Sequence, residues 1–157
     1  MRDVLDELVA EGNTLVVVEH DPGMVGFADR AVSLGPGAGP LGGRIVGDTE
    51  ETEGLLDVAV ERTRRRSTGP PIRITGATLH NLEGTGLEIE RGVLNVVVGP
   101  SGAGKSSLVF GTLLPALTGQ PGGPFEALEG VEGGAALAVD ARPMGRSSRS
   151  TPDRKST

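Results

Sequence analysis

The sequence predicts an α/β fold with parallel strands and flanking helices. Two short apolar runs rich in β-branched residues, at 14–19 and 93–98, are typical of parallel strands buried on both faces. Apolar residues recur at helical spacing in 3–11 and 106–117. Glycine-rich turns separate these patterns, and strands that alternate with helices favour a parallel sheet.

The N-terminal part, residues 1–63, alternates between helix and strand patterns. Asp21 followed by Pro22 is typical of a helix start, so we expect a helix at 22–29. The other elements expected here are a helix at 3–11, strands at 14–19, 30–34 and 44–47, a loop at 35–43 and a weak helix at 52–63.

A stretch of Arg, Ser, Gly and Pro at 64–71 is the expected linker between two parts of the chain. The part beyond it, 72–157, is expected to contain strands at 72–74, 87–89, 93–98 and 135–139, a helix at 106–117 and a glycine-rich loop at 119–134. Each part supplies few strands, and buried parallel strands need neighbours on both sides. Both parts are therefore expected to be incomplete domains.

Composition limits the possible function classes. The 157 residues include 26 glycines, 3 aromatic residues and no cysteine, which excludes disulfides and cysteine-based zinc sites in this chain. Four acidic residues within 1–11 do not suit a secretory signal, and no apolar run reaches the roughly 18 residues of a membrane span. We expect a cytoplasmic protein with no membrane partner.

The net charge of −6 gives no overall electrostatic reason for nucleic-acid binding. Arginines cluster at 62–66, and basic residues mark 142–155. We expect both clusters to be solvated, the first in a linker and the second in a tail.

Residues 99–106 (GPSGAGKS) match the pattern G-x-x-x-x-G-K-[ST] at every fixed position. A triphosphate is a compact polyanion, and successive main-chain N–H groups can surround it where glycines remove the side chains. The loop leads into an expected helix, whose first N–H groups favour an anion. Lys105 adds a positive charge for the β- and γ-phosphates, and the Ser106 hydroxyl is a potential Mg²⁺ ligand.

The pattern therefore predicts a site for ATP and Mg²⁺. Its context supports this, because the motif needs a buried strand before it and a helix after it, and 93–98 and 106–117 supply them. The candidate site comprises Gly99, Pro100, Ser101, Gly102, Ala103, Gly104, Lys105, Ser106 and Ser107, with Ser106 as the Mg²⁺ ligand.

Hydrolysis requires more than this loop, usually an apolar strand that ends in an acid and a group that positions water. After Ser106 the one candidate strand is 135–139, which is followed by a single acid, Asp140. His20 follows the apolar run 14–19 and could contact a γ-phosphate, although its spacing alone favours an ordinary structural histidine.

Several stretches together resemble the bacterial excinuclease family UvrA, whose members are ABC-type ATPases with two nucleotide-binding domains per chain. The stretches are 12–21 (GNTLVVVEHD), 28–47 (ADRAVSLGPGAGPLGGRIVG), 74–82 (ITGATLHNL), 93–108 around the phosphate loop, and 140–150 (DARPMGRSSRS).

The resemblance implies partial P-loop NTPase domains of the ABC ATPase type. Residues 1–63 would be the C-terminal part of the first nucleotide-binding domain, and 72–157 the N-terminal part of the second. His20 would be the switch histidine at the γ-phosphate. The implied function is ATP-dependent recognition of DNA damage in nucleotide excision repair. The implied partners are damaged duplex DNA, a second copy of the protein and the excinuclease component UvrB.

The chain also departs from the family. The family's signature motifs, its metal-binding acids and its zinc modules would lie outside 1–157. Ala141 stands where the family usually has Gln, and 153–157 no longer resemble it. We therefore expect little ATP turnover from the isolated chain.

Three alternatives remain open from the sequence. A drug-resistance paralogue of the same family would share these motifs. The stretch GPSGAGKSSL also resembles the phosphate loop of guanylate kinases, and arginines at 142–149 could hold a second phosphate group, but 51 residues after Ser106 are too few for that fold. The third alternative is a nucleotide-binding remnant without turnover.

Overall fold

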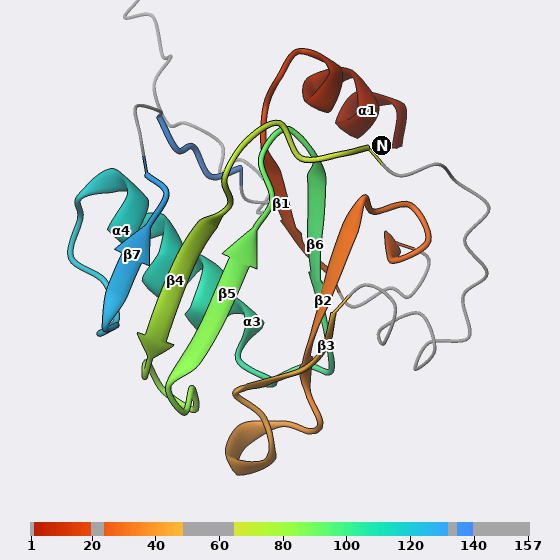
Figure 1. The fold of residues 1–157 in the computed structure, drawn as a ribbon. Coiled ribbons are helices and arrows are strands. Elements are labelled where there is room, and N and C mark those ends of the chain that lie inside the picture. The colour runs from red at the N-terminus through yellow and green to blue at the C-terminus, as the bar shows by residue number, and fades with distance from the viewer. Residues whose placement is uncertain (1, 20–23, 49–64, 132–134, 140–157) are drawn as a thin grey trace, which may run out of the picture.

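A computed structural model describes residues 2–19, 24–48, 65–131 and 135–139 (Figure 1). The elements before the linker are α1 (Arg2–Ala10), β1 (Leu15–Val18), β2 (Arg30–Gly35), the 3-10 turn η2 (Gly39–Leu41) and β3 (Arg44–Asp48). Those after it are β4 (Ile72–Ala77), β5 (Thr85–Ile89), β6 (Leu94–Val98), α3 (Lys105–Leu108), the π-helical η3 (Val109–Leu113), α4 (Leu114–Thr118) and β7 (Ala127–Glu129). Within these ranges no helix is long and apolar enough to span a membrane.

Strand β6, which precedes the phosphate loop, lies inside a four-stranded sheet of order β1-β6-β2-β3 (Figure 1). It pairs in parallel with β1 on one edge and with β2 on the other, while β3 runs antiparallel to β2. Val97 is in register with Val18 on one side and with Val32 on the other. The stretch 64–71 separates the two parts of the chain in sequence, and this sheet joins them in space.

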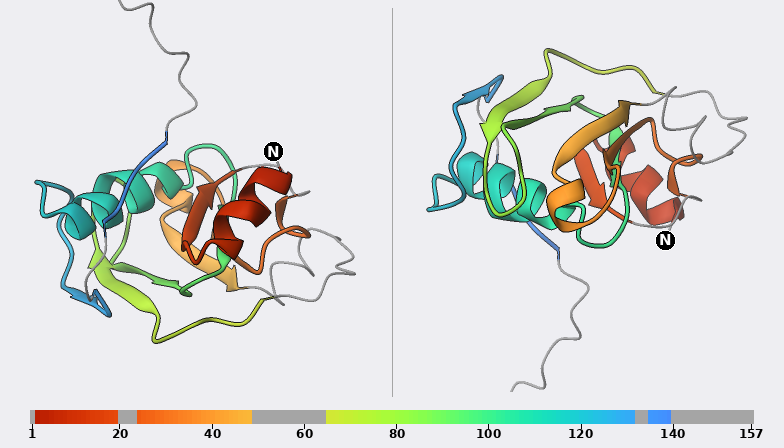
Figure 2. Two further views of the ribbon diagram at one scale, coloured as in Figure 1. Left: turned by 90° about the horizontal axis from the view of Figure 1, so that it is seen from above. Right: turned by 90° about the horizontal axis from the view of Figure 1, so that it is seen from below.

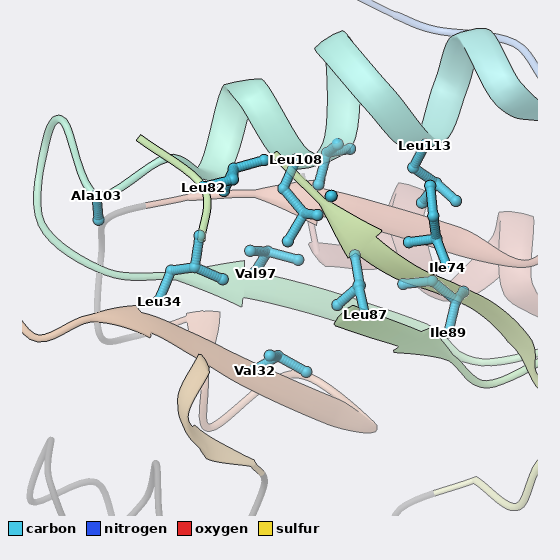
Figure 3. Close-up of a cluster of buried hydrophobic side chains, with 12 residues drawn as sticks. Val32, Leu34, Ile74, Leu82, Leu87, Ile89, Val97, Ala103, Leu108 and Leu113 are labelled. Atoms are coloured by element: carbon cyan, nitrogen blue, oxygen red, sulfur yellow. The ribbon is translucent and has the colours of Figure 1, made fainter. Parts of the chain in front are cut away.

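A second sheet, of order β5-β4-β7, is antiparallel throughout. The main core lies among this sheet, the β6 sheet and the helical stretch formed by α3, η3 and α4 (Figure 3). Its buried members are Val32, Leu34, Ile74, Ala77, Leu82, Leu87, Ile89, Val97, Ala103, Leu108, Val109 and Leu113. The strand–loop–helix unit of the phosphate motif is therefore held by packing along its whole length.

A smaller core covers the opposite face of β6, where α1 and residues 24–28 pack (Figure 2). Leu94, Val96 and Val98 point into this smaller core, whereas Val97 points into the main one. Side chains alternate across a strand, so a strand covered on both faces must be apolar on both. All five residues of β6 are buried, as the continuous apolar run predicts.

Most of the expected elements are present. The helix expected at 3–11 and the strands expected at 14–19, 30–34, 44–47, 72–74, 87–89 and 93–98 correspond to α1 and to β1 through β6. The helix expected at 106–117 corresponds to the helical stretch 105–118. The helix expected at 52–63 lies outside the described residues.

The helix expected at 22–29 is wrong for its described portion. Residues 24–28 form a single turn, closed by the Ala28 N–H on the Met24 carbonyl at 3.0 Å. Gly26 within this turn lowers helix propensity. The carboxylate of Asp29, which follows the turn, accepts a hydrogen bond from the Leu94 N–H at 2.9 Å and so directs the chain into β2.

The strand expected at 135–139 is also wrong, because these residues form no strand and both Leu137 and Val139 are exposed. The edge of β4 is taken instead by β7, which sequence reasoning placed inside a loop. A strand of three residues carries too little pattern to be recognised, because its pairing with β4 decides its conformation.

Arg65 corrects the expectation of a solvated arginine cluster. Its guanidinium binds Asp29 at 3.2 Å and Asp6 at 2.6 Å, and its N–H binds the Asp29 carboxylate at 3.0 Å. The hydrogen bond to Asp6 is the main cause that raises the pKa of Arg65 above its ordinary value. Because Asp29 also binds Leu94, this cluster ties the linker to α1 and to the start of β6.

Asn95 is a buried polar residue within β6. Its side-chain oxygen accepts the Glu90 N–H at 2.9 Å, and its amide donates to the carbonyls of Glu90 at 2.9 Å and Leu15 at 3.2 Å. One side chain thus closes the turn before β6 and fastens β6 to β1.

We predict that Asn95→Leu, which has a similar size, lowers the free energy of unfolding by about 2 kcal/mol, because it leaves main-chain groups of the turn unpaired. Urea denaturation measures this loss. The control is Asn13→Ala, whose exposed amide donates a single hydrogen bond to Leu8, and it should cost less than about 1 kcal/mol. Equal losses in the two variants would contradict the role given to Asn95.

Candidate phosphate-binding site

The loop after β6 is tightly bent. Gly99, Gly102 and Gly104 have φ angles of +138°, +78° and +103°, a region that side chains disfavour. The Ala103 N–H binds the Pro100 carbonyl at 3.1 Å and closes a turn within the loop. The motif therefore forms a compact loop that leads directly into α3.

Lys105 lies over this loop. Its Nζ donates hydrogen bonds to the carbonyls of Gly99 at 2.7 Å and Pro100 at 2.9 Å. Burial lowers the pKa of the Lys105 ammonium below its ordinary value, and the negative charge of nearby Glu19 opposes this shift. The amine is thus held at the loop by neutral carbonyl partners, which a charged phosphate oxygen could replace.

Several main-chain donors of the loop are available to a ligand. In the described part of the chain, the N–H groups of Ser101, Gly102 and Gly104 have no main-chain acceptor. The Leu108 N–H, bound to the Gly104 carbonyl at 2.9 Å, makes the first helical hydrogen bond, so the N–H groups of the first turn also stay free of main-chain partners there. Unpaired N–H donors in a bent loop, beside one ammonium group, suit a polyphosphate.

The glycines also serve packing. A Cβ on Gly99 would lie 2.1 Å from the Leu34 carbonyl oxygen, and one on Gly104 would lie 3.0 Å from a Leu82 methyl carbon. The loop that follows β2 rests on the phosphate loop through the Gly39 N–H, which binds the Gly102 carbonyl at 3.0 Å. Neighbouring backbone thus requires glycine at position 99, and neighbouring side chains leave little room at position 104, whether or not a ligand is bound.

Two residues next to the loop were not assigned a role by sequence reasoning. Asn81 donates to the carbonyls of Gly39 at 3.1 Å and Gly102 at 3.2 Å. The His80 Nδ1 lies 3.0 Å from the Ser107 Oγ. In the sequence, the stretch ITGATLHNL stands out only through its family resemblance. Its spacing along the chain does not show that it lies against the phosphate loop.

Of the other residues predicted for the site, only some lie in the part of the chain that the structure describes. Ser106 is exposed at the second position of α3. The Glu19 N–H binds the Val97 carbonyl at 3.1 Å, so the end of β1 lies beside the end of β6. His20, Asp140, Ala141 and the arginines at 142–149 lie outside the described residues.

Comparison with known proteins finds relatives that share one name, although no family model matches the chain. UvrABC system protein A of Thermus thermophilus is 39% identical over 162 residues, covering 90% of this chain and 17% of the relative. The Aquifex aeolicus protein of the same name is 36% identical over 90% of this chain, and the Staphylococcus aureus protein is 34% identical over 96%. The chain thus spans 17 to 18% of the length of these relatives.

We predict that Gly99→Ala lowers the free energy of unfolding by about 3 kcal/mol or more even without a ligand, because its Cβ would meet the Leu34 carbonyl. Thermal or urea denaturation measures the effect. Gly84→Ala is the control, since Gly84 also has a positive φ, of +70°, but its Cβ would meet nothing within 4 Å. It should cost about 1 kcal/mol. A similar small loss for Gly99→Ala would contradict the packing role.

Proposed function

Since this chain belongs to the UvrABC system protein A family and matches a segment of it, we propose that its phosphate loop binds ATP with Mg²⁺. The observation that carries this proposal is the position of the Lys105 amine over a bent loop whose N–H groups are available to an anion. The wider role is ATP-dependent recognition of DNA damage in nucleotide excision repair.

The residues of the loop take distinct roles in this proposal. The main-chain N–H groups surround the β-phosphate, and Lys105 moves from its carbonyl partners to the β- and γ-phosphates. Mg²⁺, when bound, neutralises phosphate charge, and the Ser106 hydroxyl would hold it. The described residues contain no cluster of three acidic or histidine side chains for a metal, so phosphate oxygens and water would complete its ligands.

The organisation of the chain is proposed as the end of one nucleotide-binding domain, 1–63, a linker, 64–71, and the start of a second, 72–157. Strand β6 of the second part lies between β1 and β2 of the first, so each part supplies strand edges that the other uses, as expected of incomplete domains. His20, next in sequence to Glu19, is proposed as the switch histidine.

The whole protein is proposed to act in the cytoplasm, on damaged duplex DNA, as a pair of copies and together with the excinuclease component UvrB. The name UvrABC system protein A, borne by the relatives, supports a shared system with UvrB and DNA in general, and it does not favour a guanylate kinase. We expect little hydrolysis by this chain alone, because the family's signature motifs and metal-binding acids would lie outside 1–157.

Mg-ATP should raise the thermal stability of the chain in a saturable way. A ligand that binds only the folded state stabilises it by about 2.7 kcal/mol at a hundredfold excess over Kd. Lys105→Ala should remove most of this effect, while Thr118→Ala, at the far end of the helical stretch, should retain it. Differential scanning calorimetry with increasing Mg-ATP measures the shift, and the absence of a shift in the unaltered chain would refute ATP binding.

Nucleotide affinity should fall as pH rises toward the ordinary lysine pKa of about 10.4. Burial lowers the Lys105 pKa in the free chain, and a bound polyphosphate favours the ammonium form and raises that pKa. Binding is therefore strongest below the pKa of free Lys105 and weakens as pH rises through it. Lys105→Arg keeps its charge over this range and should flatten the profile, as isothermal titration calorimetry can show. An equally steep profile in this variant would exclude Lys105 as the titrating group.

A further inference from the structure

The loop between β4 and β5, residues 78–84, crosses the start of the phosphate-loop helix. Leu82 is buried in the main core and packs beside Gly104. Leu79 packs against Gly111, where an added Cβ would lie 2.4 Å from a Leu79 methyl carbon. We call residues 78–84 the crossing loop, and these two leucines fix it on either side of His80 and Asn81.

The backbone of the crossing loop is strained at His80. Among the described residues, His80 is the non-glycine residue with a positive φ, of +55°. Such a conformation costs free energy and persists where the surroundings determine it. Asn81 supplies part of that constraint, because its amide joins the carbonyls of Gly39 and Gly102.

The strained conformation places the His80 ring at the candidate site. Its Nδ1 lies 3.0 Å from the Ser107 Oγ in the first turn of the helix. The ring is exposed, and it lines an open hollow of ≈ 340 Å³ together with Gly39, Pro40, Asn81, Leu82 and Glu83. None of the residues that line this hollow belongs to the phosphate loop, so the 3.0 Å contact with Ser107 is what brings the ring to the site, and a ligand that meets the Ser107 hydroxyl could also reach the ring.

The position of Ser107 indicates which phosphate this pair would meet. Consecutive helical residues are about 100° apart around the axis, so the hydroxyls of Ser106 and Ser107 face different sides of the helix start. If Ser106 holds the metal between the β- and γ-phosphates, the α-phosphate is the part of the triphosphate that remains for Ser107 and His80.

We propose that His80 is a nucleotide-binding residue that, together with the Ser107 hydroxyl, contacts the α-phosphate. This inference rests on the proposed binding of ATP by the phosphate loop. It gives the crossing loop a role in ligand recognition, and it accounts for a histidine at a position where glycine would fold at lower cost.

The test compares two replacements that keep the backbone conformation. His80→Gly suits a positive φ and removes the ring. His80→Asn also tolerates this φ and places an amide nitrogen near the position of Nδ1, so it should restore much of the contact. Thr78→Ala, an exposed change in the same loop, is the matched control, because the Thr78 N–H that binds the Pro124 carbonyl is kept.

Calorimetric titration with the two diastereomers of ATPαS reports directly on the α-phosphate, because sulfur replaces one of its two non-bridging oxygens. The unaltered chain should prefer one diastereomer. His80→Gly should bind Mg-ATP roughly tenfold to a hundredfold more weakly and lose this preference, as expected for a lost hydrogen bond to a charged group. His80→Asn should recover most of both, and Thr78→Ala should change neither.

The outcomes separate this inference from the proposed function. If Lys105→Ala abolishes ATP binding while His80→Gly keeps the affinity and the diastereomer preference, ATP binding stands and the role of His80 is refuted. A His80→Gly variant that loses thermal stability without nucleotide, yet keeps the preference, would show a purely structural role and also refute it. Failure of the unaltered chain to bind Mg-ATP overturns both.

Discussion

The candidate site depends on hydrogen bonds that β6 makes along both of its edges. β1 and β2 pair with it in parallel, and both belong to the N-terminal part of the chain. Without them, a largely apolar strand would expose its main-chain groups, and the loop that follows it would lose its anchor. The buried amide of Asn95 strengthens the same arrangement, because it fastens the turn before β6 to β1.

Close approach of main chains is the second constraint, and it explains part of the high glycine content. The phosphate loop, the loop after β2 and the crossing loop meet with little side-chain material between them. The Gly43 N–H binds the Ala103 carbonyl at 2.8 Å, and a Cβ on Gly43 would lie 1.8 Å from the Asn81 carbonyl oxygen. Glycines that suggest flexibility in the sequence here permit tight packing between loops.

The sequence could predict the local elements and the phosphate loop, because both depend on near neighbours along the chain. Periodicity located β6 and the helix after it, and the chemistry of a polyanion explained the spacing of glycines and Lys105. The order of strands was not predictable, since an apolar run does not specify which edge it pairs with. The environment of Arg65 and the contact of His80 with Ser107 join residues far apart in sequence, so no spacing rule could show them.

The four-stranded sheet combines strands from both parts of the chain, and this affects folding during synthesis. If its two parts derive from two similar domains, each strand edge has more than one acceptable partner within a longer polypeptide. Early pairing between strands of different domains would then compete with pairing inside each domain while synthesis continues, as happens in repeat proteins that exchange segments. The complementary strand edges that let the two parts of this chain share a sheet are therefore also a source of misassembly. The order in which strands emerge during translation would decide which sheet forms first.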